Sequence, residues 1–95
     1  MTFEWDEAKD RINIKKHGIN FETATRVFND SFRIELYDKD HSCDEERYKT
    51  IGEVCGRPLV ISVTYTERKE VIRLISARKA TAREKRLYYD YKKRD

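Results

Sequence analysis

The sequence is poor in residues that break, loosen or crosslink a chain. It contains one proline, three glycines and two cysteines among 95 residues. Two cysteines cannot build the disulfide framework of a small secreted domain, so we expect Cys43 and Cys55 to be reduced thiols. Three dispersed glycines also exclude a glycine-rich phosphate-binding loop.

Long apolar segments are missing as well. No run approaches the roughly 20 apolar residues that a helix needs to cross a bilayer. The opening Met-Thr-Phe-Glu-Trp-Asp has no basic segment followed by an apolar one, so we expect no signal peptide. Repeats and low-complexity linkers are absent too. The sequence therefore predicts a cytoplasmic protein that does not contact a membrane and consists of a single domain, residues 1–95.

Charge is abundant, and its distribution along the chain is uneven. Charged residues make up 41% of the sequence and the net charge is +3. Residues 76–95 hold eight Lys or Arg against three Asp or Glu, a local net charge of +5. A basic stripe of this kind is typical of a nucleic-acid-binding surface. A solvated helix face is the ordinary explanation for a single run of charge.

Three helices are predicted from polar N-cap residues and helical spacing. The first covers residues 7–16 and stops near Gly18, and the second covers residues 21–29. The third begins at Thr81, which has the spacing of a capping box with Glu84. The N-caps are Asp6, Asn20 and Thr81. Ala8 and Ile12 share one side of the first helix, and Glu84, Leu87, Tyr88 and Tyr91 share one side of the third. The second helix should bury Ala24, Val27 and Phe28.

Alternating apolar residues predict four strands after the second helix. They cover residues 32–37, 47–54, 59–65 and 71–77, while Phe3–Trp5 is only a short extended fragment. Short connections favour an antiparallel meander. We therefore expect an α+β domain with two N-terminal helices, a four-stranded antiparallel sheet and a C-terminal helix. One face of the third strand should carry Leu59, Ile61, Val63 and Tyr65.

Several short motifs occur along the chain in a distinctive combination. They are Phe3-Glu4-Trp5-Asp6, Lys9, Asn13, Lys16-His17-Gly18, Phe21, Ala24, Phe28 and Asp30, followed by Arg47, Gly52, Leu59, Tyr65, Arg73, Ile75-Ser76-Ala77-Arg78, Ala80, Glu84 and Tyr88. With these residues the chain resembles the BrnT family of toxins from bacterial type II toxin–antitoxin systems. The resemblance runs from residue 3 to about residue 89 and leaves out the acidic loop 38–46.

The resemblance implies a RelE-like fold and a ribonuclease that halts translation and growth. It also implies a partner, a BrnA-like antitoxin with a ribbon-helix-helix DNA-binding part. The antitoxin would neutralise the toxin, and the complex would repress its own operon. Because ribbon-helix-helix domains form two-fold dimers, we expect a complex of two toxins and two antitoxins. Operator DNA would be contacted only through the antitoxin.

The residues can support RNA cleavage without a metal. In that reaction the ribose 2′-hydroxyl attacks its own phosphorus, with the help of a base, an acid and cations. No His or Cys spacing resembles a zinc site, so we expect no metal and no other cofactor. The candidate catalytic residues are His17, Arg47, Arg73, Arg78, Glu84 and Tyr88. The candidate RNA-binding residues are Lys16, Lys49, Tyr65 and Arg68.

Structural explanations compete with several of these roles. His17 suits the C-terminal end of a helix, Glu84 completes a capping box, and Tyr88 can be a core residue. Arg73 lies opposite the apolar face of its strand, where a ligand has room, but any single arginine can simply pair with an acid. Two other classes of function therefore stay open, a non-catalytic RNA- or DNA-binding module and a protein-interaction domain.

Overall fold

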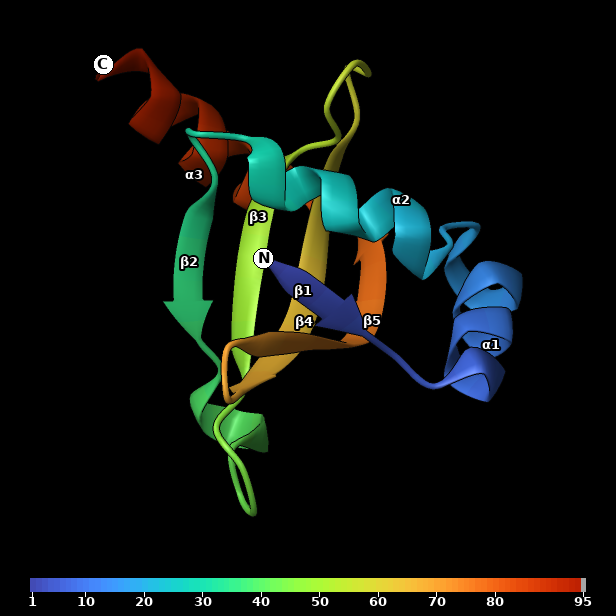
Figure 1. Cartoon of the computed structure of the whole chain (residues 1–95). Coiled ribbons are helices and arrows are strands. Elements are labelled where there is room, and N and C mark those ends of the chain that lie inside the picture. The colour runs from blue at the N-terminus through green and yellow to red at the C-terminus, as the bar shows by residue number, and fades with distance from the viewer. Residues whose placement is uncertain (95) are drawn as a thin grey trace.

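A computed structural model describes residues 1–94, which form a five-stranded sheet with helices on both faces (Figure 1). The predicted domain, residues 1–95, extends beyond the described part by Asp95 alone. The elements are β1 (Thr2–Glu4), α1 (Glu7–His17), α2 (Phe21–Thr25), the 3-10 helix η1 (Arg26–Asn29), β2 (Ile34–Tyr37), the 3-10 helix η2 (Lys39–His41), β3 (Tyr48–Glu53), β4 (Val60–Arg68), β5 (Val71–Lys79) and α3 (Ala82–Lys93).

The sheet has the strand order β1-β5-β4-β3-β2. The strands β2 to β5 form the expected antiparallel meander. However, β1 adds a fifth strand that runs parallel to β5, with Phe3 opposite Ile72. The prediction of a four-stranded, purely antiparallel sheet is therefore wrong. A three-residue strand shows almost no alternation, and its partner lies near the other end of the sequence, so no local pattern reveals the pairing.

Helix capping follows the predicted residues. The side chains of Asp6 and Asn20 accept hydrogen bonds from amides in the first turns of α1 and α2. Thr81 and Glu84 form both bonds of a capping box at the start of α3. Gly18 ends α1 with φ = 72°, a left-handed conformation that glycine adopts without steric cost.

The packing of α1 depends on a polar residue. Ala8 is exposed and 62% of the surface of Ile12 is exposed, so the side of the helix that they share faces solvent. The buried residue of α1 is Asn13, whose amide nitrogen donates to the carbonyl oxygens of Ile19 and Ala77 at 2.8 Å each. Its amide oxygen accepts from the backbone N–H of Ala77 at 3.1 Å. An asparagine side chain has the same donor and acceptor as a peptide group, so it continues the hydrogen bonding at the edge of β5.

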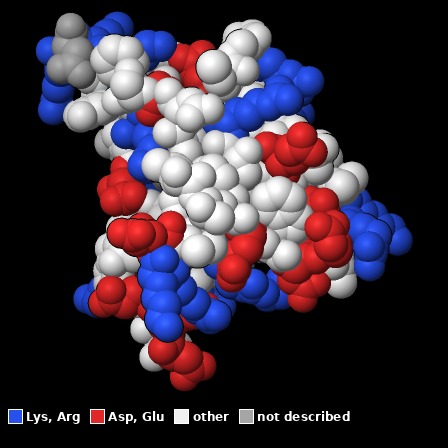
Figure 2. Space-filling model, in the orientation of Figure 1, with Lys and Arg blue, Asp and Glu red and all other residues white. Residues whose placement is uncertain are grey.

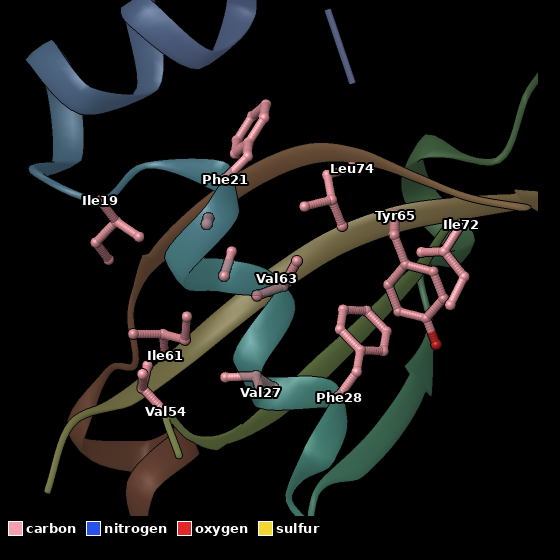
Figure 3. Packing of buried hydrophobic residues seen from close by; sticks show 12 residues of the cluster. Ile19, Phe21, Val27, Phe28, Val54, Ile61, Val63, Tyr65, Ile72 and Leu74 are labelled. Atoms are coloured by element: carbon pink, nitrogen blue, oxygen red, sulfur yellow. The ribbon is translucent and has the colours of Figure 1, made fainter. Parts of the chain in front are cut away.

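The main core lies between the sheet and the segment formed by α2 and η1 (Figure 3). The predicted helix over residues 21–29 is confirmed, although its last four residues form a 3-10 helix. Burial of each large apolar side chain contributes roughly 1.5–3 kcal/mol, so this layer dominates the stability of the fold. The cluster comprises Ile19, Phe21, Ala24, Val27, Phe28, Val54, Ile61, Val63, Tyr65, Ile72, Leu74 and Ala77.

Helix α3 packs on the opposite face of the sheet. Of the residues that share one side of this helix, Tyr88 is buried, whereas Leu87 is 49% and Tyr91 45% exposed. The Tyr88 hydroxyl lies 2.5 Å from Oδ2 of Asp30 and 3.2 Å from Oε1 of Glu53. Burial and both carboxylates raise the pKa of Tyr88, so the hydroxyl keeps its proton.

Charges of both signs alternate over the side of the molecule that carries α2 and η1, and lysines and arginines gather at the end of α3 (Figure 2). None of the helices in residues 1–94 is long and apolar enough to span a membrane. Cys43 and Cys55 are both exposed free cysteines.

Candidate functional site

The sheet face opposite α2 and η1 is open between α3 and the loop that connects β2 to β3. Alternation in β4 places Ile61 and Val63 in the main core and turns Thr64 toward the open face. Alternation in β5 buries Ile72 and Leu74 and turns Arg73 the other way, as expected. The open face is therefore the polar side of β4 and β5.

A β-bulge decides which residues of β5 reach this face. Thr64 pairs with Ser76 while Tyr65 pairs with Leu74, so Ile75 is an extra residue in β5. Because of this insertion, the next buried residue after Leu74 is Ala77. A regular strand would turn residues 76 and 78 toward the core. The bulge instead places Ser76 and Arg78 on the open face.

These residues line a pocket of about 270 Å³, which we call the arginine pocket. It lies over β3, β4 and β5, and the β2–β3 loop forms one wall. Three cationic side chains enter it from different elements, and all three are candidates from the sequence. The lining residues are Asp38, His41, Arg47, Lys49, Thr64, Ile75, Ser76 and Arg78.

The β2–β3 loop folds back onto the open face through a few polar contacts. Thr66 on β4 donates its hydroxyl proton to the carbonyl oxygen of Glu46 at 2.7 Å. Within the loop, the Ser42 hydroxyl donates to the carbonyl oxygen of Asp38 at 2.6 Å and accepts from the amide of Arg47 at 2.9 Å. These bonds close the loop and fix Asp38, Arg47 and the residues between them beside the sheet.

Arg78 is held by Glu84 in a two-pronged ion pair. Its two terminal nitrogens lie 2.7 and 3.0 Å from the two carboxylate oxygens of Glu84. Glu84 also accepts a hydrogen bond from the amide of Thr81, so one carboxylate both caps α3 and orients Arg78. The hydrogen bonds from Arg78 hold the pKa of Glu84 below its usual range, and Glu84 raises that of Arg78.

Arg73 and Arg68 lie on the open face outside the arginine pocket, and acids pair with both. Arg73 bonds to Glu4 on the neighbouring β1 at 2.9 Å. Arg68 donates through Nε and a terminal nitrogen to Glu45 of the β2–β3 loop, and these hydrogen bonds lower the pKa of Glu45. Arg47 and Lys49, in contrast, form no ion pair among residues 1–94. The Nε of Arg47 is buried and has no hydrogen-bond partner within the same described residues.

Four residues expected at the site lie elsewhere. Tyr65 is only 2% exposed on the helix-covered face and donates to Glu35, so it cannot stack on a base in this conformation. The side of β4 that carries Tyr65 was predicted correctly, and that side is the core. Tyr88 is fully buried and does not line the arginine pocket. Lys16 and His17 end α1 at the edge of the sheet and do not line the arginine pocket.

His41 is the notable residue that reasoning from the sequence did not propose as catalytic. Its Nδ1 lies 3.1 Å from each carboxylate oxygen of Asp38, and its ring lines the arginine pocket. The spacing Asp-x-x-His was the available signal, but it carries no meaning until the loop is known to fold back over β4 and β5. Among residues 1–94 no cluster of three or more His, Cys, Asp or Glu is arranged to hold a metal ion.

Comparison with known proteins decides the family. The model of the ribonuclease toxin BrnT of type II toxin–antitoxin systems matches residues 5–84. The chain belongs to the BrnT family. The resemblance read from the sequence is therefore confirmed, and with it the description as a ribonuclease toxin.

A solved relative supports the same family. The chain is similar to the crystal structure of the Brucella abortus ribonuclease toxin BrnT, with 28% sequence identity and a TM-score of 0.66. The similarity covers 85% of this chain and 97% of the Brucella chain. No curated protein sequence matches significantly.

Proposed function

We propose that this BrnT-family toxin cleaves RNA in the arginine pocket, without a metal ion. The observation that carries the proposal is the convergence of Arg47, Lys49 and Arg78 on one pocket of the open face. Three cations around one phosphate would stabilise the extra charge that develops when the 2′-oxygen attacks phosphorus. Guanidinium groups suit this task because their planar donors match phosphate oxygens. The expected products carry a 2′,3′-cyclic phosphate.

Glu84 is, in this proposal, a positioning residue that acts through Arg78. Both of its oxygens already bond to the guanidinium, and one also caps α3. A carboxylate with a lowered pKa is a poor base for a ribose hydroxyl. Glu84→Gln would keep the cap of α3 but weaken the two hydrogen bonds to Arg78. We therefore expect kcat to fall less than in an Arg78 variant. Equal and complete loss of activity in folded Glu84→Gln and Glu84→Ala proteins would instead assign Glu84 to proton transfer.

Arg68 and Arg73 would hold the RNA strand on the open face beside the pocket. Each has an acidic partner in the free protein, so RNA must replace Glu45 and Glu4 to bind them fully. We expect Arg73→Ala to lower the affinity for RNA and to make that affinity less dependent on salt concentration. Cleavage of bound RNA should continue. This separates strand binding from the chemistry in the pocket.

The first experiment measures cleavage of single-stranded RNA by the purified chain in EDTA. Arg47→Ala and Arg78→Lys should lower the rate about a hundred- to a thousand-fold, because the removed contacts act in the transition state. Lysine at position 78 keeps the positive charge but lacks the two planar donors of a guanidinium. Because the charge remains, Glu84 does not lose its cationic partner. Arg11→Ala is the control, since Arg11 is an exposed residue of α1 outside the pocket. Products with a 3′-hydroxyl, or activity that EDTA abolishes and a divalent ion restores, would refute the mechanism.

A non-catalytic RNA-binding module would give a different result. It would bind RNA through the same cations and leave the strand intact under all conditions. Growth arrest on expression would then persist in variants that retain RNA binding.

We further propose that a BrnA-like antitoxin with an acidic toxin-binding part covers the arginine pocket and α3, in a complex of two toxins and two antitoxins that represses the operon. A groove of about 460 Å³ between β2 and α3 supports a protein partner there, because Leu36, Leu87 and Tyr91 expose apolar surface beside Arg33 and Arg94. Attraction between acidic and basic surfaces predicts that association slows steeply from about 50 to 500 mM salt. A rate independent of salt, or a complex that leaves Arg78 open, would contradict this assignment.

A further inference from the structure

The arginine pocket contains a histidine in a geometry suited to proton transfer. His41 ends η2, and its side chain is 65% exposed, while its partner Asp38 is only 9% exposed. Nδ1 of His41 lies 3.1 Å from both Asp38 oxygens. A carboxylate can only accept, so in the neutral ring the proton resides on Nδ1 and the lone pair on Nε2. Asp38 therefore fixes the tautomer in which Nε2 can accept a proton.

The fold holds this pair against the cations of the pocket. Asp38 follows β2 directly, and its amide donates to the carbonyl oxygen of Arg47 at 2.8 Å. Ser42 bonds to both ends of the loop, so the segment between Asp38 and Arg47 is closed on itself. His41 and Arg47 consequently approach the same space above Thr64 and Ser76 as Arg78 and Lys49 do.

We propose that His41 is the general base of RNA cleavage, with Asp38 as its positioning residue. This inference rests on the proposed function of the arginine pocket. Nε2 takes the proton of the ribose 2′-hydroxyl while the 2′-oxygen forms a bond to phosphorus and the bond from phosphorus to the 5′-oxygen breaks. The leaving 5′-oxygen takes a proton from water, and the resulting hydroxide removes the proton from the imidazolium. The step is balanced and regenerates neutral His41.

The other groups with titratable protons are poorer candidates for this role. Both oxygens of Glu84 bond to Arg78, and Tyr88 is buried on the far side of α3 from solvent. His17 ends α1 at the edge of the sheet and does not line the pocket. Of the two histidines in the chain, only His41 lies among the phosphate-binding cations.

Charged groups of both signs surround His41. The acids lie on its own loop, and the basic groups come from the loop, β3, β4 and β5. The groups that line the two pockets shared by His41 are Asp38, Asp40, Cys43, Asp44, Glu45, Arg47, Lys49, Arg68 and Arg78.

The test compares the two histidines in the full-length chain. His41→Gln should lower cleavage about a hundred- to ten-thousand-fold, the usual contribution of a general base. Binding of an RNA whose 2′-oxygens are methylated, and which cannot be cleaved, should stay within about threefold because the phosphate contacts remain. His17→Gln is the matched control and should cleave at the wild-type rate. Asp38→Asn should lower kcat while KM for RNA stays near the wild-type value, because the ring loses its fixed tautomer and the phosphate contacts remain.

A second variant guards against a purely structural effect. His41→Ala should regain part of its cleavage when free imidazole is added, which a merely misfolded loop would not do. Wild-type cleavage by His41→Gln, or loss of cleavage in His17→Gln, overturns the assignment while leaving the arginine pocket in place. If instead the wild-type chain cuts no RNA, and arginine and histidine variants behave alike, the proposed function falls together with this inference.

Discussion

Tyr88→Phe separates a structural from a catalytic role for a residue that the sequence placed at the site. The substitution removes one hydroxyl from a fully buried side chain and changes its volume very little. That hydroxyl donates to Asp30 at 2.5 Å, and Asp30 also accepts from the backbone amides of Phe32 and Glu53 at 2.9 Å each. The partly buried carboxylate of Asp30 would lose one of its three donors.

The magnitude follows from the charge of the acceptor. A hydrogen bond to a charged group contributes about 1.5–3 kcal/mol to stability, and roughly this amount should be lost from the free energy of unfolding. In a domain of this size each kcal/mol lowers Tm by about 4–8 °C. Chemical denaturation followed by circular dichroism measures the loss. Ribonuclease activity per folded molecule should stay at the wild-type level, since Tyr88 has no access to RNA.

The neighbouring Tyr89 provides a control, because it is 41% exposed and its hydroxyl has no hydrogen bond within residues 1–94. Tyr89→Phe should change the free energy of unfolding by less than about 0.5 kcal/mol. The reasoning fails if Tyr88→Phe is as stable as Tyr89→Phe. It also fails if Tyr88→Phe is stable but inactive, since that would restore a role in the reaction.

Three further predictions concern stability. Asn13→Asp should destabilise more than Asn13→Ala, by urea unfolding, because a carboxylate puts acceptors against two carbonyl oxygens where the amide donated. Replacing Lys69 by Asn and Glu70 by Gly should raise the unfolding free energy by about 1–2 kcal/mol, since both residues have positive φ, 47° and 69°, in a two-residue hairpin turn that favours Asn-Gly. Stability should fall as pH drops below about 4, because Asp30 and Glu84 have folded-state pKa values below their unfolded ones, so the stability they add above the unfolded pKa is lost as they protonate. Urea titrations at a series of pH values test this, and Asp30→Asn should flatten the dependence.

Patterns among neighbouring residues were sufficient to predict most of the helices and strands. The N-caps and the alternation of β4 and β5 were predicted from neighbouring residues alone, and the structure confirms them. Capping and side-chain alternation depend on bonds within a few residues, so no knowledge of the fold is needed. The apolar spacing of α1 and α3, in contrast, does not show which of their residues are buried. Whether Ile12 or Leu87 is buried depends on the surface that the helix meets, and α1 meets a strand edge that binds Asn13 instead.

The site could be predicted only in part because its geometry is non-local. Arg78 reaches the open face through a bulge at Ile75, which the alternation of β5 alone does not indicate. His41 joins the cations because a hydroxyl on β4, from Thr66, holds the loop against the sheet. Residue type alone does not distinguish the two histidines, because His17 and His41 differ only in where the fold places them.

The pairing of the arginines shows how a surface ion pair and a phosphate-binding role can belong to the same residue. Arg68, Arg73 and Arg78 each have an acidic partner, as expected for surface residues, and yet all three lie on the open face. A paired guanidinium is neutralised and oriented, and it retains N–H donors that its partner does not use. Arg78 uses its two terminal nitrogens for Glu84, which leaves its Nε proton for a ligand. Arg47 and Lys49 have no ion-pair partner within residues 1–94, so they attract phosphate without first releasing a carboxylate. Initial contact with RNA should therefore form inside the pocket, beside His41, and spread outward to Arg73 and Arg68 as Glu4 and Glu45 are displaced.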